Sequence, residues 1–329
     1  MSDTKVEPIC IDTGRISAIP LSEDPVHKAI WKCYNEQMES FWIAGKFKWV
    51  KDAANFKSLP KRIQESILIV FLFFAPADGE VGEFVGKLSQ EFKLPELNYC
   101  QDWQKQMENI HSVTYNQGLA AFVPNDEVRA MMIVDAMADP CIKAKLGFIR
   151  KWMDPTQPLR MRVLALAIVE GVMFSSAFAF IDWLKYQKYN MPDLFATNHE
   201  ISRDEGNHQK SASLAHLCLV NRITPKEFKD IADDAQHIEN TFVDRLIPEG
   251  GFPGLTRVGM KKHVEHCFNI TAESFKCSNL YGTTSSPLIW MTERSLNTKE
   301  NFFEVTGLNY RMVGENKSDI DPYTTALNF

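Results

Sequence analysis

Two Glu-x-x-His pairs, Glu108 with His111 and Glu205 with His208, are the residues of this sequence best suited to chemistry. Each pair lies in a stretch with helical periodicity, so the three-residue spacing places carboxylate and imidazole on one face of a helix. Two such helices, joined by a single carboxylate from each of two others, can hold a pair of metal ions inside a bundle. The pairs therefore predict a carboxylate-rich di-metal site.

A third acidic residue, Glu170, stands alone in the apolar run from Val163 to Ile181. An ionised carboxylate in such surroundings is costly unless it is paired, protonated or metal-bound, and the two His-bearing stretches favour metal. The run is long enough to cross a membrane, but a glutamate near its middle would be expensive in lipid. We therefore predict a helix that is buried on all sides inside a bundle, and no membrane span.

The residues one or two helical turns from these ligands are also informative. Tyr115 lies four residues after His111, which allows a phenol beside the metal site. An apolar collar is formed at the same spacing by Phe174, Phe178 and Ile201. Taken singly these residues would be ordinary core. Together they suggest oxidation of the tyrosine by one electron to a radical that dry walls protect.

Composition excludes several classes of function. The chain has 329 residues, a formal net charge of -6 and no basic footprint, so nucleic acid is not an expected partner. Its 7 cysteines form no Cys-x-x-Cys motif, which indicates a reducing compartment, the cytoplasm, without a disulfide framework. The first twenty residues lack the charged head and apolar run of a secretory signal.

The hydrophobic pattern predicts an all-α protein with no substantial sheet. The expected helices start at Asp24-Pro25, run over 60–92 with a bend at Pro76, and continue over 95–122, 127–152, 163–181, 192–221, 225–246 and 255–280. We expect an N-terminal extension over 1–20, a helical domain over 21–306 and a flexible C-terminal tail over 307–329.

Several motifs resemble those of a known family. QMENIHSVTY (106–115), VEGVMFSSAFA (169–179) and EISRDEGNH (200–208) resemble the radical-generating small subunit of class I ribonucleotide reductase, a ferritin-like di-iron protein. The similarity extends through DPVHKAIWKCYNEQMESFW near the start and SLNTKENFFE near the end, so it covers essentially the whole chain. It implies a ferritin-like helical bundle with additional helices.

The resemblance also implies roles for individual residues. Iron ligands would be Glu108, His111, Glu170, Glu205 and His208, with Tyr115 as the radical tyrosine inside a pocket of Phe174, Phe178 and Ile201. Trp31 and Asp204 would conduct the radical equivalent away, and Tyr310 would pass it to the large subunit. The tail would dock that large subunit, and the small subunit would form a homodimer or a heterodimer with a paralogue.

One position departs from the family pattern. The family carries a sixth ligand, an aspartate, and a gap-free match anchored on FFAPADG puts Lys48 at its position. An ammonium there would remove a ligand and repel the metal ions. A local shift of the chain that leaves Lys48 in solvent is the other interpretation.

Three functions follow from these expectations. The first is an active small subunit, whose di-iron centre generates a Tyr115 radical for ribonucleotide reduction. The second is a metal-deficient auxiliary subunit, in which Lys48 pairs with Glu108 or Glu205 and the chain assembles with a fully liganded paralogue. A stand-alone di-iron oxidase ranks third, because it would need neither Tyr310 nor the tail. Metal content after reconstitution and a tyrosyl radical signal separate the first two. The choice between iron and manganese and the nucleotide specificity stay open.

Overall fold

The computed structural model describes residues 15–19, 21–278 and 280–291. The regular elements within them are helices, and Phe252 and Leu255 form an isolated antiparallel bridge. The elements are α1 (Pro25–Glu39), η1 (Ala44–Lys46), α2 (Val50–Phe56), α3 (Lys61–Ser89), α4 (Pro95–Phe122), α5 (Asp126–Ala138), α6 (Pro140–Met153), α7 (Leu159–Ile168), η2 (Val169–Met173), α8 (Ser175–Tyr186), α9 (Pro192–Leu217), α10 (Pro225–Leu246) and α11 (Arg257–Ser274). The predicted all-α class is confirmed.

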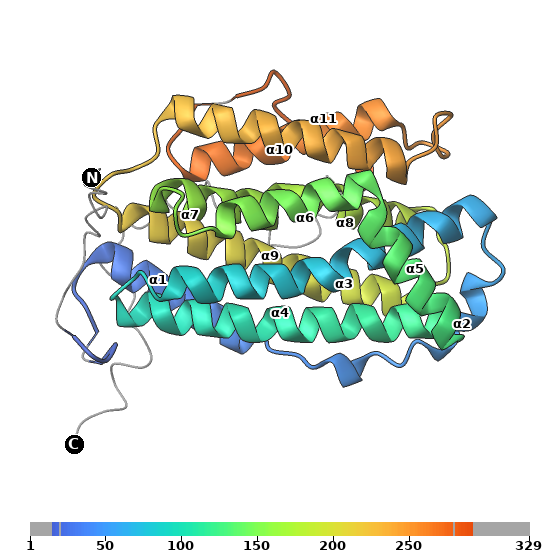
Figure 1. Cartoon of the computed structure of the whole chain (residues 1–329), viewed down its shortest axis with the longest axis horizontal. Coiled ribbons are helices and arrows are strands. Elements are labelled where there is room, and N and C mark those ends of the chain that lie inside the picture. Colours follow the sequence, from blue (N-terminus) through green and yellow to red (C-terminus); the bar gives the residue numbers. More distant parts are fainter. Residues whose placement is uncertain (1–14, 20, 279, 292–329) are drawn as a thin grey trace.

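The long helices form a layered bundle (Figure 1). Helices α3 and α4 run side by side along the long axis of the molecule, and α9 packs against both α4 and α7. Helices α10 and α11 form the layer at the top of the view, and α5 lies at one end of the α3–α4 pair. Nearly all large apolar side chains on the facing sides join one continuous core. The bundle therefore encloses the middle of α3, α4, α9 and the α7–α8 stretch.

Local sequence signals explain several helix ends. Asp24 accepts hydrogen bonds from the backbone N–H groups of Val26 and His27, which caps α1 with Pro25 in its first turn, as predicted. The expected single helix over 127–152 is wrong, because Asp139 ends α5 and caps α6, which begins at Pro140. An Asp-Pro pair is a helix start, and here it interrupts an otherwise continuous apolar pattern.

At Pro76, where a bend is expected, the helix is not divided, since α3 runs through the proline from Lys61 to Ser89. Proline removes one N–H from the helical ladder. The neighbouring α4 contacts the helix beside the proline, where the Ser112 hydroxyl donates a hydrogen bond of 2.9 Å to the Ala75 carbonyl. The helix therefore continues past the proline and includes Asp78.

The apolar run predicted as a core helix is confirmed. The stretch Leu159–Tyr186 is long and apolar enough to cross a membrane, yet its most apolar window is buried throughout. A π-helical turn, η2, interrupts it at Val169–Met173 and carries Glu170. At Gly171 a Cβ atom would lie 2.6 Å from the Gln209 side chain, so only glycine lets α9 approach this turn so closely.

Candidate metal centre

Four helical segments bring six chemically active side chains into the middle of the bundle. Each of the six is fully buried: Asp78 from α3, Glu108 and His111 from α4, Glu170 from η2, and Glu205 and His208 from α9. The five residues that the sequence pattern singled out therefore lie together. The sixth, Asp78, is one that sequence reasoning missed.

The side chains approach one another as two overlapping groups. In one, ligand atoms of Glu108, Glu170, Glu205 and His208 all lie within 4.8 Å of one another, and in the other those of Asp78, Glu108 and His111 do. Glu108 is common to both groups, so a bridging carboxylate joins them. Such overlap is what a pair of adjacent cations requires.

The histidines lie among the carboxylates. His208 Nδ1 is 2.9 Å from Glu108 Oε1 and 3.0 Å from Glu205 Oε2. His111 Nδ1 is 3.1 Å from Glu205 Oε1 and 3.5 Å from Glu108 Oε2. Each of the two imidazoles thus has carboxylate oxygens close to its Nδ1 atom.

Many of these buried atoms lack hydrogen bonds. Among the described residues, both carboxylate oxygens of Asp78 have no hydrogen-bond partner, nor do Glu170 Oε2 and His208 Nε2. The Glu108 oxygens and Glu205 Oε1 lie near the histidines without the geometry of a hydrogen bond. Orphaned polar atoms are expensive in a protein interior and call for a water or an ion. Carboxylate oxygens with imidazole nitrogens are ligands suited to divalent iron or manganese. The donor set therefore fits a pair of metal ions.

The electrostatics of the cluster agree. Burial and the neighbouring charge of Glu108 raise the pKa of Asp78 well above its usual value. Burial and the charge of Glu205 do the same to the pKa of Glu170. Burial pushes the pKa of Glu205 upward, but hydrogen bonds from Glu170 and the histidines outweigh it and hold that pKa low. Asp78 and Glu170 thus favour their protonated forms in this dry site, and cations would replace those protons.

A glutamine also contacts the cluster. Gln104, one turn before Glu108 on α4, donates a hydrogen bond of 2.7 Å to Glu170 Oε1. That bond orients the carboxylate and satisfies one of its oxygens, leaving the other turned toward the histidine. The four-residue spacing from Glu108 could have indicated Gln104 in the sequence, because it places both on one helix face.

Of the two interpretations of Lys48, the structure agrees with the one that leaves this residue in solvent. Lys48 is exposed, and its Nζ donates a 2.8 Å hydrogen bond to the carbonyl of Gly45 in the segment before α2. The carboxylate that completes the cluster is Asp78, which belongs to the FFAPADG motif itself. The physical signal was present, because Asp78 is an acidic residue that directly follows an apolar run over 67–77. The position of Lys48 therefore gives no specific support to a metal-deficient auxiliary subunit.

The structure does not bring Trp31 together with Asp204, as the expected relay would require. Trp42 Nε1, and not Trp31, donates a 2.7 Å hydrogen bond to Asp204 Oδ2. The same oxygen lies 3.1 Å from His111 Nε2, and the Trp42 and His111 rings stack at 5.7 Å. Trp31 instead packs against Tyr34 on the outer side of α1. Asp204 is confirmed as a neighbour of the cluster, with a different tryptophan as its partner.

Tyr115 lies beside the cluster in an aromatic enclosure. Its ring is 1% exposed, stacks on Phe74 at 4.7 Å and meets the edge of Phe71 at 5.4 Å. Burial, with the charge of Asp78 second, raises the pKa of its phenol, so the hydroxyl stays protonated. That hydroxyl has no hydrogen-bond partner among the described residues.

Two members of the expected collar of Tyr115 contact its neighbour Phe74. Phe174 and Phe178 each contact the Phe74 ring at 5.1 Å, so they support the ring on which Tyr115 stacks. Ile201 is fully buried on α9. Tyr310, the tail over 307–329 and residues 1–14 of the N-terminal extension lie outside the described residues.

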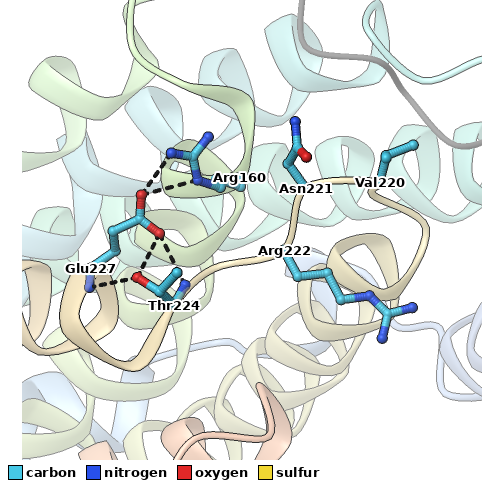
Figure 2. A pocket seen from close by; sticks show the side chains of 6 residues that line it. All are labelled: Arg160, Val220, Asn221, Arg222, Thr224 and Glu227. Atoms are coloured by element: carbon cyan, nitrogen blue, oxygen red, sulfur yellow. Dashed lines mark hydrogen bonds and ion pairs between the residues drawn. The ribbon is translucent and has the colours of Figure 1, made fainter.

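A surface pocket at the start of α10 is separate from the centre (Figure 2). It is lined by Arg160, Val220, Asn221, Arg222, Thr224 and Glu227. Glu227 closes a capping box with Thr224 and also accepts a 2.6 Å hydrogen bond from Arg160 Nη2. Since its acid serves both a helix cap and an arginine, this pocket is explained by the stability of α10.

Fold and site together define a ferritin-like helical bundle whose buried carboxylate and histidine cluster could hold metal. The family model "Ribonucleotide reductase, small chain" matches residues 23–287, so the chain belongs to the small-chain family of ribonucleotide reductase. A small chain from Spisula solidissima is 33% identical over 99% of this chain and 85% of its own length. Human subunit M2 of ribonucleoside-diphosphate reductase is 32% identical over 87% of this chain and 73% of its own length.

Solved structures share the fold. The Saccharomyces cerevisiae Rnr4 homodimer matches with a TM-score of 0.76 and 23% identity over 93% of both chains. Dimanganese(II)-NrdF from Streptococcus sanguinis matches with a TM-score of 0.70 and 15% identity, over 85% of this chain and 97% of that one. The ferritin-like bundle with additional helices is therefore confirmed.

Proposed function

We propose that this chain is an active, radical-generating small subunit of ribonucleoside-diphosphate reductase. Asp78, Glu108, Glu170 and Glu205 would hold two iron ions together with His111 and His208. The observation that carries the proposal is the cluster of four buried carboxylates, most of whose oxygens lack a hydrogen-bond partner among the described residues, beside a buried Tyr115 whose hydroxyl also lacks one. When bound, the metal ions would supply the oxidising power for one-electron chemistry with oxygen.

The protein's own part is to hold and protect the oxidised residue. Loss of an electron and a proton from the Tyr115 hydroxyl leaves a neutral phenoxyl radical. Phe71 and Phe74 keep water and reductants away from its ring, and no neighbouring hydrogen bond favours a charged form. The pocket thus favours a long-lived radical.

We propose that the radical equivalent leaves the site through His111, Asp204 and Trp42. These three side chains form a continuous hydrogen-bonded and stacked path from the cluster to the segment that follows α1. Trp31 makes no such connection. Tyr310 and the tail over 307–329 would then pass the equivalent to a large subunit in the cytoplasm.

The metal and radical are tested by anaerobic reconstitution with Fe²⁺ followed by exposure to oxygen. We expect about two iron ions per chain, as a carboxylate pair site requires, and an electron paramagnetic resonance signal of a tyrosyl radical. The Tyr115→Phe variant should bind the same iron and give no such signal. Iron well below one ion per chain, or a signal that survives in Tyr115→Phe, would refute the proposal. Reconstitution with Mn²⁺ in parallel decides between the two metals.

The partners are tested by separate measurements. We propose a homodimer, which is the assembly of the yeast Rnr4 structure. Light scattering on the purified chain should give twice the mass of 37.6 kDa, whereas a monomer that dimerises only with a paralogue would contradict this. Deletion of residues 307–329 should abolish ribonucleotide reduction with added large subunit while the radical signal stays intact.

A further inference from the structure

A buried ion pair lies behind the metal centre, between helices that contribute no ligand. Lys145 on α6 and Glu239 on α10 are both completely buried, and Lys145 Nζ lies 2.7 Å from Glu239 Oε2. The ammonium also lies 4.0 Å from the ring centre of Phe73 and 3.8 Å from that of Phe242. The remaining oxygen of Glu239 accepts a hydrogen bond from Ser176.

Stability alone does not account for this pair. Removing two charges from water costs free energy that their attraction only partly returns, and apolar replacements of such pairs are often as stable or more so. The distinctive feature is a third contact, because Lys145 Nζ also donates a hydrogen bond to the Met173 carbonyl. Met173 is the last residue of η2, the π-helical turn that carries Glu170.

A π-helical turn leaves the regular helical ladder and needs support from outside. Here side-chain donors give this support. The Ser175 hydroxyl donates a hydrogen bond of 2.6 Å to the Val172 carbonyl, and Lys145 Nζ donates one to the carbonyl of the next residue, Met173. Gln209 packs on Gly171 from the opposite side, and Gln104 holds the Glu170 carboxylate. The turn is therefore gripped at both of its ends.

We propose that Lys145 is a positioning residue for the metal centre, which clamps η2 so that Glu170 stays directed at its metal. Glu239 holds the ammonium in place and balances its charge. Without the donor, η2 can rewind toward a regular helix, and each residue of rewinding turns the side chains by about 100° about the axis. This inference rests on the proposed function, because it concerns the same metal pair.

The test compares variants that differ at residue 145 in one background. Glu239→Gln alone keeps the Lys145 donor, whereas Lys145→Met/Glu239→Gln removes it without leaving a buried charge unpaired. Lys151→Met on the same helix is the matched control, because Lys151 forms a half-exposed pair with Asp234. Metal binding is followed in the metal-free protein by the visible absorption of added Co²⁺, and folding by circular dichroism.

We expect Glu239→Gln and Lys151→Met to bind Co²⁺ as the wild type does. The Lys145→Met/Glu239→Gln variant should bind about 10- to 100-fold more weakly, the loss typical of groups that orient a ligand. Hydrogen exchange of the 169–173 amides should be faster in that variant while its melting temperature stays close to that of Glu239→Gln. Faster exchange confined to η2 is a change that a merely structural pair would not produce.

Wild-type Co²⁺ affinity in the folded Lys145→Met/Glu239→Gln variant would overturn the inference, as would equal weakening in Glu239→Gln alone. If the methionine variant does not fold, Lys145→Gln/Glu239→Gln takes its place, because the shorter side chain still fills the site without reaching Met173. It should bind Co²⁺ weakly, and binding like the wild type overturns the inference. A wild-type chain that binds no Co²⁺ would instead refute the metal centre itself and the inference with it.

Discussion

Replacing Asp78 by asparagine tests the composition of the metal centre. The change keeps the shape of the side chain and removes one of four buried carboxylates, Asp78, Glu108, Glu170 and Glu205. Four carboxylates balance two divalent cations, so the variant would leave one positive charge uncompensated in a dry site. We expect metal affinity to fall at least about 100-fold, which corresponds to about 2.7 kcal/mol.

That loss can be read from thermal unfolding. Bound metal stabilises the folded chain by mass action, so a 100-fold weaker site returns about 2.7 kcal/mol less at the same excess of metal. At about 2.1 cal/mol/K per residue, the 329 residues have an unfolding entropy of about 0.7 kcal/mol/K, so the metal-induced rise in Tm should shrink by about 4 °C. The metal-free variant should melt no lower than the wild type, because burial and Glu108 already disfavour the charge on Asp78.

The assay is differential scanning calorimetry of metal-free and Mn²⁺-loaded protein, with metal counted per chain. Lys48→Ala is the control, because Lys48 is exposed and bonded only to a nearby carbonyl. Its metal content and its metal-induced rise in Tm should equal those of the wild type. An Asp78→Asn variant that keeps two tightly bound ions, or a Lys48→Ala variant that loses them, would refute the assignment of the sixth ligand.

Three further predictions concern the surroundings of the centre. Trp42→Phe should retain the tyrosyl radical and lose ribonucleotide reduction with added large subunit, whereas Trp31→Phe should retain both; loss in the second variant alone would contradict the path. Gly118→Ala should destabilise the fold by about 1–3 kcal/mol in urea unfolding, because the added Cβ would lie 2.3 Å from the Phe71 ring, and an unchanged midpoint would refute this. Burial raises the pKa of Asp52 to about 6 although backbone N–H groups of α9 oppose the shift, so the folded state binds its proton more tightly than the unfolded state. Its contribution to stability therefore becomes less favourable as pH rises from about 4 to 6, and the Tm of the wild type relative to Asp52→Asn should fall over that range; a constant difference would count against it.

Much of the fold follows from local signals that act within a helix. The bounds of α4, Pro95–Phe122, agree with the expected 95–122 because a proline begins the helix and Pro124 prevents its continuation. The Glu-x-x-His spacing likewise shows which side chains share a face. Both kinds of evidence come from residues a few positions apart, where helical geometry alone determines neighbourhood.

The remainder of the site depends on contacts between distant segments. Trp31 and Trp42 belong to one aromatic stretch, and only the course of the chain after α1 decides that Trp42 reaches Asp204. Asp78 lies 30 residues before Glu108, so its approach depends on the packing of α3 on α4. Lys145 reaches η2 from a third helix. The periodicity of a single segment cannot predict these contacts between side chains of different helices.

The buried stretch Leu159–Tyr186 has a consequence for synthesis of the chain. It is as apolar as a membrane-spanning segment, and its covers include α9, α10 and α11, all of which follow it in the sequence. A ribosome therefore releases this segment before those covering helices exist. During that interval the nascent chain carries the hallmark of an insertion signal, and shielding by a chaperone must last until roughly the final third of the protein has been made.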